Sequence, residues 1–180
     1  MTLTNLLPTL RLTLPDPLDR DRWPEYTTAT TQDVVIAGVS LLRLAEWCST
    51  PCLHTAAAVI PGTGGRPSET ELTSVVVVRV EAVSARPDGG LAVRIDGDLD
   101  LVAAVTAEAR LIGRVSTVRN TRVRIGAAML ELPGDVRAGD LVTVPIAGVA
   151  RLHDVDPRRH PAAEAAPTAT PDAPPSRCGR

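Results

Sequence analysis

The chain has 180 residues, of which 44% are apolar, and its formal net charge is −2. This length and apolar content suffice for one domain with its own core. Aromatic side chains make up only 2% of it. Without aromatic platforms or a basic field, this composition argues against a nucleic-acid partner. All 19 of its Lys and Arg residues are arginine, so the chain offers no side-chain amine for a Schiff base.

Residues 1–32 are rich in Pro and Thr and are predicted to form an extended arm that lies on the rest of the domain, with Trp23 as its anchor. A mobile N-terminus is the alternative. No signal peptide is expected, because the start is not basic and prolines interrupt it. No apolar run approaches a membrane span, so we expect a cytoplasmic protein. Leucines that would be wasteful in solvent favour the docked arm: Leu6, Leu7, Leu10, Leu12 and Leu14.

The next elements alternate between strand and helix. Residues 33–38 indicate a short strand, and Ser40 is placed to cap a helix over 41–48, whose apolar residues recur at helical spacing. Pro51 ends this helix, and residues 52–60 resume as a strand.

A valine-rich segment follows a glycine-rich loop over 61–68 and predicts the strongest strand of the chain, residues 74–83. The run of valines indicates burial on both faces. A Pro-Asp-Gly-Gly turn within 86–90 then favours a hairpin, with residues 91–96 pairing back on the valine strand.

The second half is more ambiguous. Residues 101–112 are Ala-rich, which favours a helix. Residues 119–125 alternate Arg with apolar residues, as a half-exposed strand does. Residues 130–132 are expected to continue this strand after Gly126. Residues 141–145 predict a last strand. We expect one mostly β domain over 33–156 with one short helix, and a disordered tail over 157–180, which has no periodicity.

Two groups of short motifs occur in a fixed order. The first group is Leu7-Pro8, Trp23-Pro24, Gly38-Val39-Ser40-Leu41, Leu44-Ala45-Glu46 and Thr50-Pro51. The second is Gly65-Arg66, the strand 74–83, Ile95-Asp96-Gly97, Leu132-Pro133, and Arg137-Ala138-Gly139-Asp140-Leu141 with Pro145. The first resembles the beginning, and the second the end, of diaminopimelate decarboxylases, which are fold-type III pyridoxal-phosphate enzymes.

The resemblance covers residues 5–155 but omits the catalytic barrel of that family. Only about ten residues separate Thr55 from Gly65, where family members have a barrel of about 250 residues. That barrel holds the cofactor lysine, the phosphate loop and the catalytic histidine. The resemblance therefore implies a stand-alone, barrel-like β domain with a strand near 109–112. Pyridoxal phosphate is expected only if a partner chain supplies the barrel.

The family's site residues in the β domain are replaced as well. Its Cys-Glu substrate pair would fall at Met129 and Leu130, and its tyrosines at Ala150 and near Ala103 and Ala107, whereas the only tyrosine here is Tyr26. Arg66 is the one candidate that the resemblance retains, as a contact for an anionic group. No catalytic residue is expected on this chain.

Other residue patterns favour plain structural roles. Cys48, Cys52 and His54 lack a fourth ligand and a usual zinc spacing, so buried thiols are expected rather than a metal site. With Cys178 the cysteines form an odd set, which suggests no disulfide framework. A third group that would orient a Cys–His pair is also missing.

Two further patterns could contact anions. The loop 61–66 is read as a plain connection, because no helix or lysine follows it as in a phosphate loop. Arg119, Arg122 and Arg124 are expected on an exposed strand face, with a docking patch for an acidic partner as the alternative.

The leading hypothesis is a non-catalytic pseudoenzyme or protein-interaction module. The family resemblance implies dimers, so the expected partner is a second copy or a decarboxylase-like chain, with neither nucleic acid nor membrane involved. One alternative is the β-domain subunit of a split pyridoxal-phosphate-dependent decarboxylase whose barrel lies on another chain. The other is a degenerate gene product without a selected role.

Overall fold

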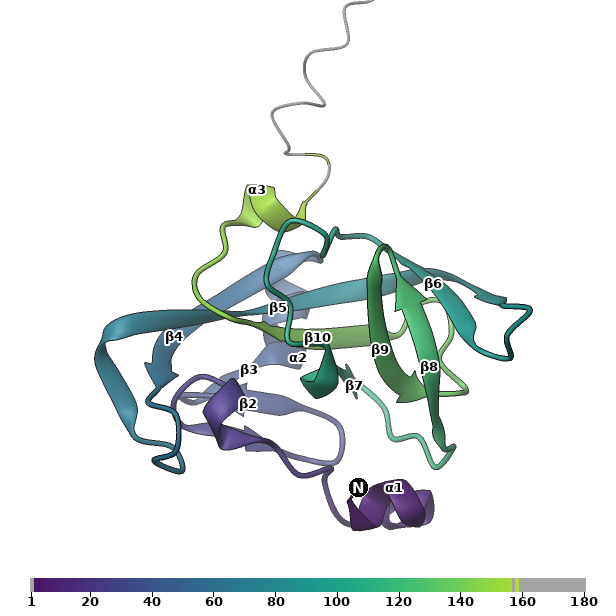
Figure 1. Ribbon diagram of the computed structural model, residues 1–180, viewed down its shortest axis with the longest axis horizontal. Helices are drawn as coiled ribbons and strands as arrows, with labels where there is room; N and C mark the ends of the chain where they lie inside the picture. Colours follow the sequence, from purple (N-terminus) through teal and green to yellow (C-terminus); the bar gives the residue numbers. More distant parts are fainter. Residues whose placement is uncertain (1, 157, 159–180) are drawn as a thin grey trace, which may run out of the picture.

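The computed structural model describes residues 2–156 and 158 and is mostly β, with a nearly closed, barrel-like sheet (Figure 1). The mostly β domain predicted for 33–156 is therefore confirmed as a fold class. The predicted disordered tail lies outside the described residues, except for Arg158.

The main sheet has seven strands. Six of them follow one path, and β9 returns beside β7, which nearly closes the sheet. All neighbouring strands are antiparallel except β6 and β8, which are parallel. The path is β7 (Arg110–Ile112), β10 (Leu141–Ile146), β5 (Pro67–Ala85), β6 (Leu91–Ile95), β8 (Asn120–Ile125) and β9 (Ala128–Pro133), and β4 (Cys52–Val59) pairs with β5 off this path.

The long strand β5 separates two cores. Val76 and Val78 point into the barrel, whereas Val75 and Val77 point to its outer side, and all four are fully buried. The sequence prediction of burial on both faces is confirmed. A strand with apolar side chains on both faces needs cover on both sides, which here means the barrel interior and an outer layer.

Aliphatic side chains fill the barrel interior. Valines from β5 and β10 meet residues of the β8–β9 hairpin there, including Val123 and Leu132, which are fully buried. Branched aliphatic residues suit such an interior because they pack densely on a pleated surface.

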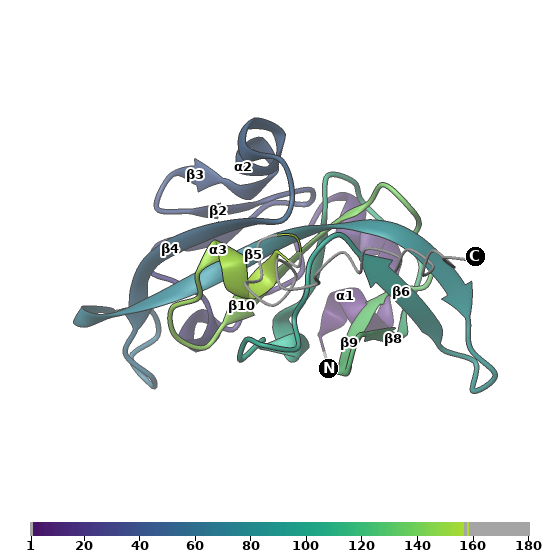
Figure 2. The ribbon, with the colours of Figure 1, turned by 90° about the horizontal axis from the view of Figure 1, so that it is seen from above.

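The outer layer is a three-stranded sheet with one helix. Figure 2 shows both on one side of β4 and β5. The strands are β1 (Thr27–Ala29), β2 (Val34–Ile36) and β3 (Val39–Ser40), and the helix is α2 (Leu41–Cys48). As predicted, Ser40 caps α2, because its side chain accepts a hydrogen bond of 3.1 Å from the backbone N–H of Arg43. Leu41 and Ala45 are buried under it.

Three sequence predictions about this fold are wrong. The described residues contain three short α-helices rather than one: α1 (Leu3–Leu6), α2 and α3 (Leu152–Val155). The N-terminal segment is not extended throughout, since it also forms the 3-10 turns η1 (Pro8–Leu12) and η2 (Arg20–Arg22), and a proline suits the first turn of η1. Strand β1 of this segment pairs with β2, so the predicted boundary at residue 32 divides a hairpin.

A fourth prediction, for the region after β8, is also wrong. Strand β9 does not continue β8 but turns back on it through Gly126 and Ala127. Gly126 has a φ of 56°, which glycine adopts without strain. In the ambiguous stretch 101–112, the strand that the family resemblance implied is present as β7, after a short 3-10 turn, η3 (Thr106–Glu108).

Candidate functional site

The best-defined polar site joins the N-terminal segment, residues 2–25 and hereafter the arm, to the main sheet. Trp23 anchors it as predicted: only 1% of this residue is exposed. Its indole N–H donates a hydrogen bond of 2.8 Å to a carboxylate oxygen of Glu108. The guanidinium carbon of Arg110 lies 6.0 Å from the centre of the Trp23 ring, which adds a cation–π contact.

Arg110 of β7 holds the arm through its backbone. One terminal nitrogen donates a hydrogen bond of 2.7 Å to the carbonyl of Asp16, and the other donates to the carbonyl of Pro17. Its Nε is buried without a hydrogen-bond partner. Burial lowers the pKa of Arg110, although the nearby carboxylate of Glu108, 3.8 Å away, favours the charged form.

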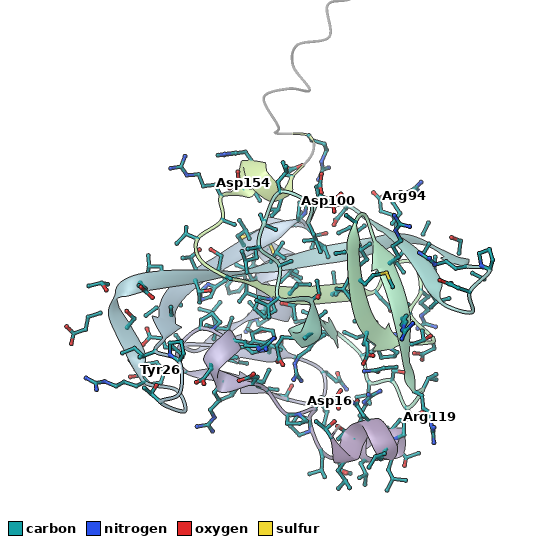
Figure 3. The ribbon with its side chains drawn as sticks, in the orientation of Figure 1. Asp16, Tyr26, Arg94, Asp100, Arg119 and Asp154 are labelled. Carbon is teal, nitrogen blue, oxygen red and sulfur yellow. The ribbon has the colours of Figure 1, made fainter. Side chains whose placement is uncertain are left out.

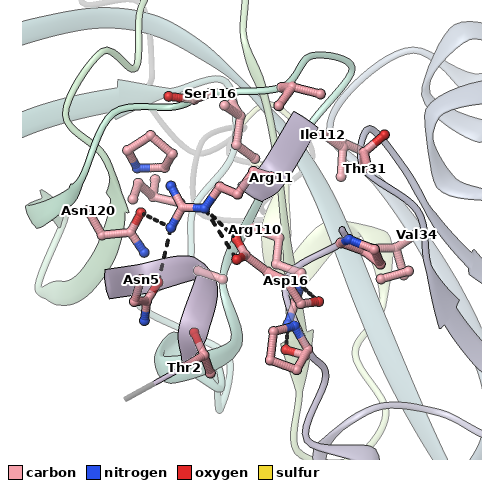
Figure 4. Close-up of a pocket in the computed structure, with 18 of the residues that line it drawn as sticks. Thr2, Asn5, Arg11, Asp16, Thr31, Val34, Arg110, Ile112, Ser116 and Asn120 are labelled. Carbon is pink, nitrogen blue, oxygen red and sulfur yellow. Dashed lines mark hydrogen bonds and ion pairs between the residues drawn. The ribbon is translucent and has the colours of Figure 1, made fainter. Parts of the chain in front are cut away.

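Arg11 of η1 makes the reciprocal contact, from the arm to the sheet. This residue is 5% exposed. Its guanidinium donates hydrogen bonds to the carbonyl of Val118 at 2.9 Å and to the side-chain oxygens of Asn5 and Asn120 at 3.0 Å (Figure 4). Its Nε pairs with Asp16 at 3.1 Å. A buried guanidinium with this many acceptors positions the chain on both sides of it.

A small polar cavity of about 180 Å³ lies between the arm, β7 and the segment that leads to β8. Drug-sized ligands occupy pockets of roughly 300–1,000 Å³, so this space is too small for a typical substrate. Arg11 and Arg110 line this cavity, and most of their N–H groups already donate hydrogen bonds to the arm or the sheet. We therefore interpret the cavity as part of the contact that fixes the arm.

A second arginine bridge borders the same cavity. Arg114 pairs with Asp140 at 2.7 Å and with Asp135 at 3.0 Å. Burial by itself would raise the pKa of Asp135. The hydrogen bonds that its carboxylate accepts from Ser116 and Arg114, together with the positive charge of Arg114, outweigh burial, so the pKa lies below its usual value. These contacts tie the turn before β10 to the turn after β7.

The leucines of the arm are placed differently from the expectation. Thr4 and Arg11 are its buried contacts near the start, whereas most of the leucines face outward. Five of them form what we call the leucine surface, with exposed fractions between 48% and 63%: Leu3, Leu6, Leu7, Leu12 and Leu14.

Arg66, the single retained candidate, is exposed in the loop between β4 and β5. Its backbone N–H donates to the hydroxyl of Thr63 at 3.1 Å, and its carbonyl accepts from the N–H of Ile60 at 2.9 Å. The glycine-rich loop thus holds its shape through its own backbone groups, the Thr63 hydroxyl and the carboxylate of Asp21, which accepts from the N–H of Gly62 at 2.8 Å.

The positions to which the predicted resemblance assigns the family's site residues lie on separate elements. Met129 and Leu130 are on β9, Ala150 follows β10, and Ala103 and Ala107 lie between β6 and β7. Leu130 and Ala150 are buried in the barrel interior. These aliphatic side chains can neither transfer a proton nor bind a cofactor's polar groups. Tyr26, whose side chain is exposed, lies away from them in the outer layer.

The cysteine and histidine candidates sit near the junction of α2 and β4. Cys52 is buried as expected, whereas Cys48 is exposed, contrary to the expectation of a buried thiol. Burial, with smaller contributions from Cys48 and Asp96, raises the pKa of Cys52 to about 11, so this thiol is a poor nucleophile near neutral pH. Burial also lowers the pKa of His54. Within residues 2–156 and 158, no group of three or more His, Cys, Asp or Glu side chains is arranged to hold a metal ion.

Arg119, Arg122 and Arg124 are exposed, as predicted. The last two lie on the outer face of β8, with Val123 buried between them, and Arg119 directly precedes the strand. They form a basic row without a catalytic partner.

Neither a family model nor a curated protein sequence matches the chain. The decarboxylase resemblance therefore stays a prediction. Among the described residues, no helix combines the length and apolar character needed to cross a membrane.

Sequence reasoning found Trp23 but missed Arg11, Glu108 and Arg110. One signal was present: Arg11 is the only charged residue between Met1 and Pro15, and a lone charge in an apolar stretch is a candidate for a buried, paired group. Glu108 and Arg110 lie in the stretch that sequence reasoning left ambiguous, so nothing marked them.

Proposed function

We propose that this chain is a non-catalytic β-domain module, a decarboxylase-like pseudoenzyme, that binds a second protein chain through the leucine surface of its arm. The partner is a second copy or a decarboxylase-like chain. The proposal depends on one observation. The arm is fixed to the sheet by Trp23, Arg11 and Arg110, yet five of its leucines are exposed to solvent. Exposed leucines that gather within one short, fixed segment favour an interaction site.

The chemistry of the chain supports a non-catalytic role. Without lysine it has no amine for an internal aldimine. The buried Cys52 is no activated nucleophile, and the arginines of the arm contact, which are hydrogen-bonded to the chain, provide no general base. The proposal includes a cytoplasmic location, with which free thiols at Cys48 and Cys52 agree. Fractionation of source cells tests this location.

The test compares two matched pairs of leucine substitutions. Light scattering after size-exclusion chromatography, and native mass spectrometry of complexes from the source cell, measure association of the full chain. Leu6→Asp/Leu12→Asp should abolish it, whereas Leu72→Asp/Leu101→Asp should leave it intact, since Leu72 and Leu101 are also exposed but lie elsewhere. A wild-type monomer that binds no chain in the cell would contradict the proposal.

The same experiment separates the split-enzyme alternative. If a barrel chain copurifies and the complex absorbs as bound pyridoxal phosphate does, the chain is an enzyme subunit rather than a pseudoenzyme. A homodimer without cofactor, lost in the Leu6→Asp/Leu12→Asp variant, supports the interaction module.

A further inference from the structure

Arginines line the exposed face of β8 without forming ion pairs among the described residues. Arg119, Arg122 and Arg124 are exposed, and none of them forms an ion pair with a carboxylate in the part of the chain that the structure describes. The only side-chain hydrogen bond among them runs from Arg124 Nε to the carbonyl of Gly126, at 3.0 Å.

Neighbouring arginines of the same sheet differ in this respect. Arg94 on β6 pairs with Glu81 at 2.9 Å, and Arg86 pairs with Asp88 at the same distance. Arg79 on β5 is also exposed and bonds only the carbonyl of Gly139, so the distinction of β8 is that its exposed arginines lie in a row.

An exposed apolar side chain lies beside this row. In the β8–β9 hairpin, Arg124 is opposite Met129, and Arg122 is opposite Glu131. Met129 is 45% exposed. We call Arg119, Arg122, Arg124 and Met129 the basic face; Arg and Met are enriched at protein interfaces, whereas Glu is depleted.

The basic face has a rigid support. Val123 and Ile125 alternate with the arginines and are buried in the barrel interior. Successive outward residues on a strand are spaced by about 7 Å, so the guanidinium groups of Arg122 and Arg124 match carboxylates at alternate positions of an extended segment.

The basic face continues into the arm. Val118, which is exposed and precedes Arg119, accepts a hydrogen bond from the buried Arg11 of the arm. Figure 3 shows Arg119 beside α1 and far from Tyr26. The start of the basic face and the arm are therefore neighbours in the fold.

We propose that the partner bound by the leucine surface carries an acidic segment that docks on the basic face, with Asp or Glu at alternate positions and an apolar side chain against Met129. This inference rests on the proposed function and specifies its partner. An acidic protein is favoured over RNA or DNA, because stacked bases need an exposed aromatic side chain beside the arginines. Trp23 is buried, Tyr26 is distant, and the exposed Trp47 lies on α2 of the outer layer rather than on the β8–β9 hairpin.

The test uses the full chain and a labelled peptide in which glutamate alternates with serine and one leucine, read by fluorescence anisotropy at low ionic strength. The control peptide has glutamine in place of glutamate. We expect the acidic peptide to bind at least about tenfold more tightly than the control, and to weaken as salt is added.

Two matched charge reversals locate the site. Arg122→Glu/Arg124→Glu should weaken peptide binding by about tenfold or more, whereas Arg20→Glu/Arg43→Glu, with the same change of net charge on exposed residues elsewhere, should change it by less than about twofold. Arg122→Gln/Arg124→Gln, with melting followed by circular dichroism, separates lost binding from lost folding.

Several outcomes would overturn the inference: equal binding of both peptides, equal losses in both reversals, or tighter arginine-dependent binding of single-stranded DNA or of phosphatidylserine vesicles. A native complex that the leucine substitutions break and the Arg122→Glu/Arg124→Glu reversal leaves intact refutes this inference alone. A complex that only the arginine reversal breaks refutes the leucine surface and retains the acidic partner.

Discussion

The barrel interior and the N-terminal arm are stabilised by different interactions. The interior is an aliphatic cluster, with Val76, Val123, Leu132 and Val142 fully buried and no polar partner required. The arm is attached by Trp23 and by side-chain hydrogen bonds that span about a hundred residues of sequence.

The difference has a functional consequence. Hydrophobic packing is non-directional, so an arm attached by its leucines would have buried them. An arm attached by guanidinium groups and one indole is fixed in place while its leucines remain outside. In the proposed function, this polar attachment leaves the leucines available to a partner. The following substitutions test whether the two regions are separable.

The largest effect is expected in the barrel interior. Leu132→Ala removes a fully buried side chain and should lower the free energy of unfolding by about 2–5 kcal/mol, through lost burial and a residual cavity. Urea denaturation measures it. The control Leu101→Ala alters an exposed side chain and should change stability by less than about 0.5 kcal/mol. Similar losses in both would mean that the interior is not packed as described.

A smaller effect is expected for the arm. Arg11→Met keeps the length of the side chain but leaves Asp16, Asn5 and Asn120 without their donor. We expect a loss of about 1.5–3 kcal/mol, the range for hydrogen bonds to a charged group. Hydrogen exchange should rise in residues 3–12 and stay low in β5. Equal increases in both segments would show that the arm and barrel unfold together.

The indole of Trp23 tests the same attachment from the other end. Trp23→Phe keeps an aromatic ring but removes the hydrogen bond to Glu108, with an expected cost of about 1–2 kcal/mol. Limited proteolysis should then cut the arm faster. Trp47→Phe, at an exposed position, serves as the control, and equal cleavage rates in the two variants would contradict the anchor.

The smallest effect concerns pH. The pKa of Asp135 lies below its usual value in the folded chain, so its contribution to stability is complete above the unfolded pKa, which is 3.8, and is lost as the pH falls through the folded value. Since Asp135 is partly exposed, we expect less than about 1 kcal/mol. The difference in free energy of unfolding between wild type and Asp135→Asn, measured by denaturation at several pH values, should decrease on acidification. A constant difference would contradict the bridge.

Local sequence signals predicted the strands and α2 well. Apolar alternation placed β6 and β8, the Ser40 cap placed the start of α2, and the valine run of β5 indicated burial on both faces. Each signal depends on neighbours within a few residues, which share the period of a strand or a helix.

The candidate site was less predictable. The anchor role of Trp23 could be inferred because the large apolar surface of an indole is costly to leave in solvent. Its partner Glu108, and the contacts of Arg11 and Arg110, join segments about a hundred residues apart, for which the sequence has no periodic signal. The exposed leucines were misjudged for the same reason: their burial depends on what lies opposite.

Composition and periodicity by themselves determined that this chain is a mostly β protein with an aliphatic core and without an amine for Schiff-base chemistry. Tertiary structure alone decided which charges are paired, which leucines face solvent, and where the arm lies. The reason is that backbone pattern is local, whereas pairing and burial depend on the distance between residues that only the folded chain brings together.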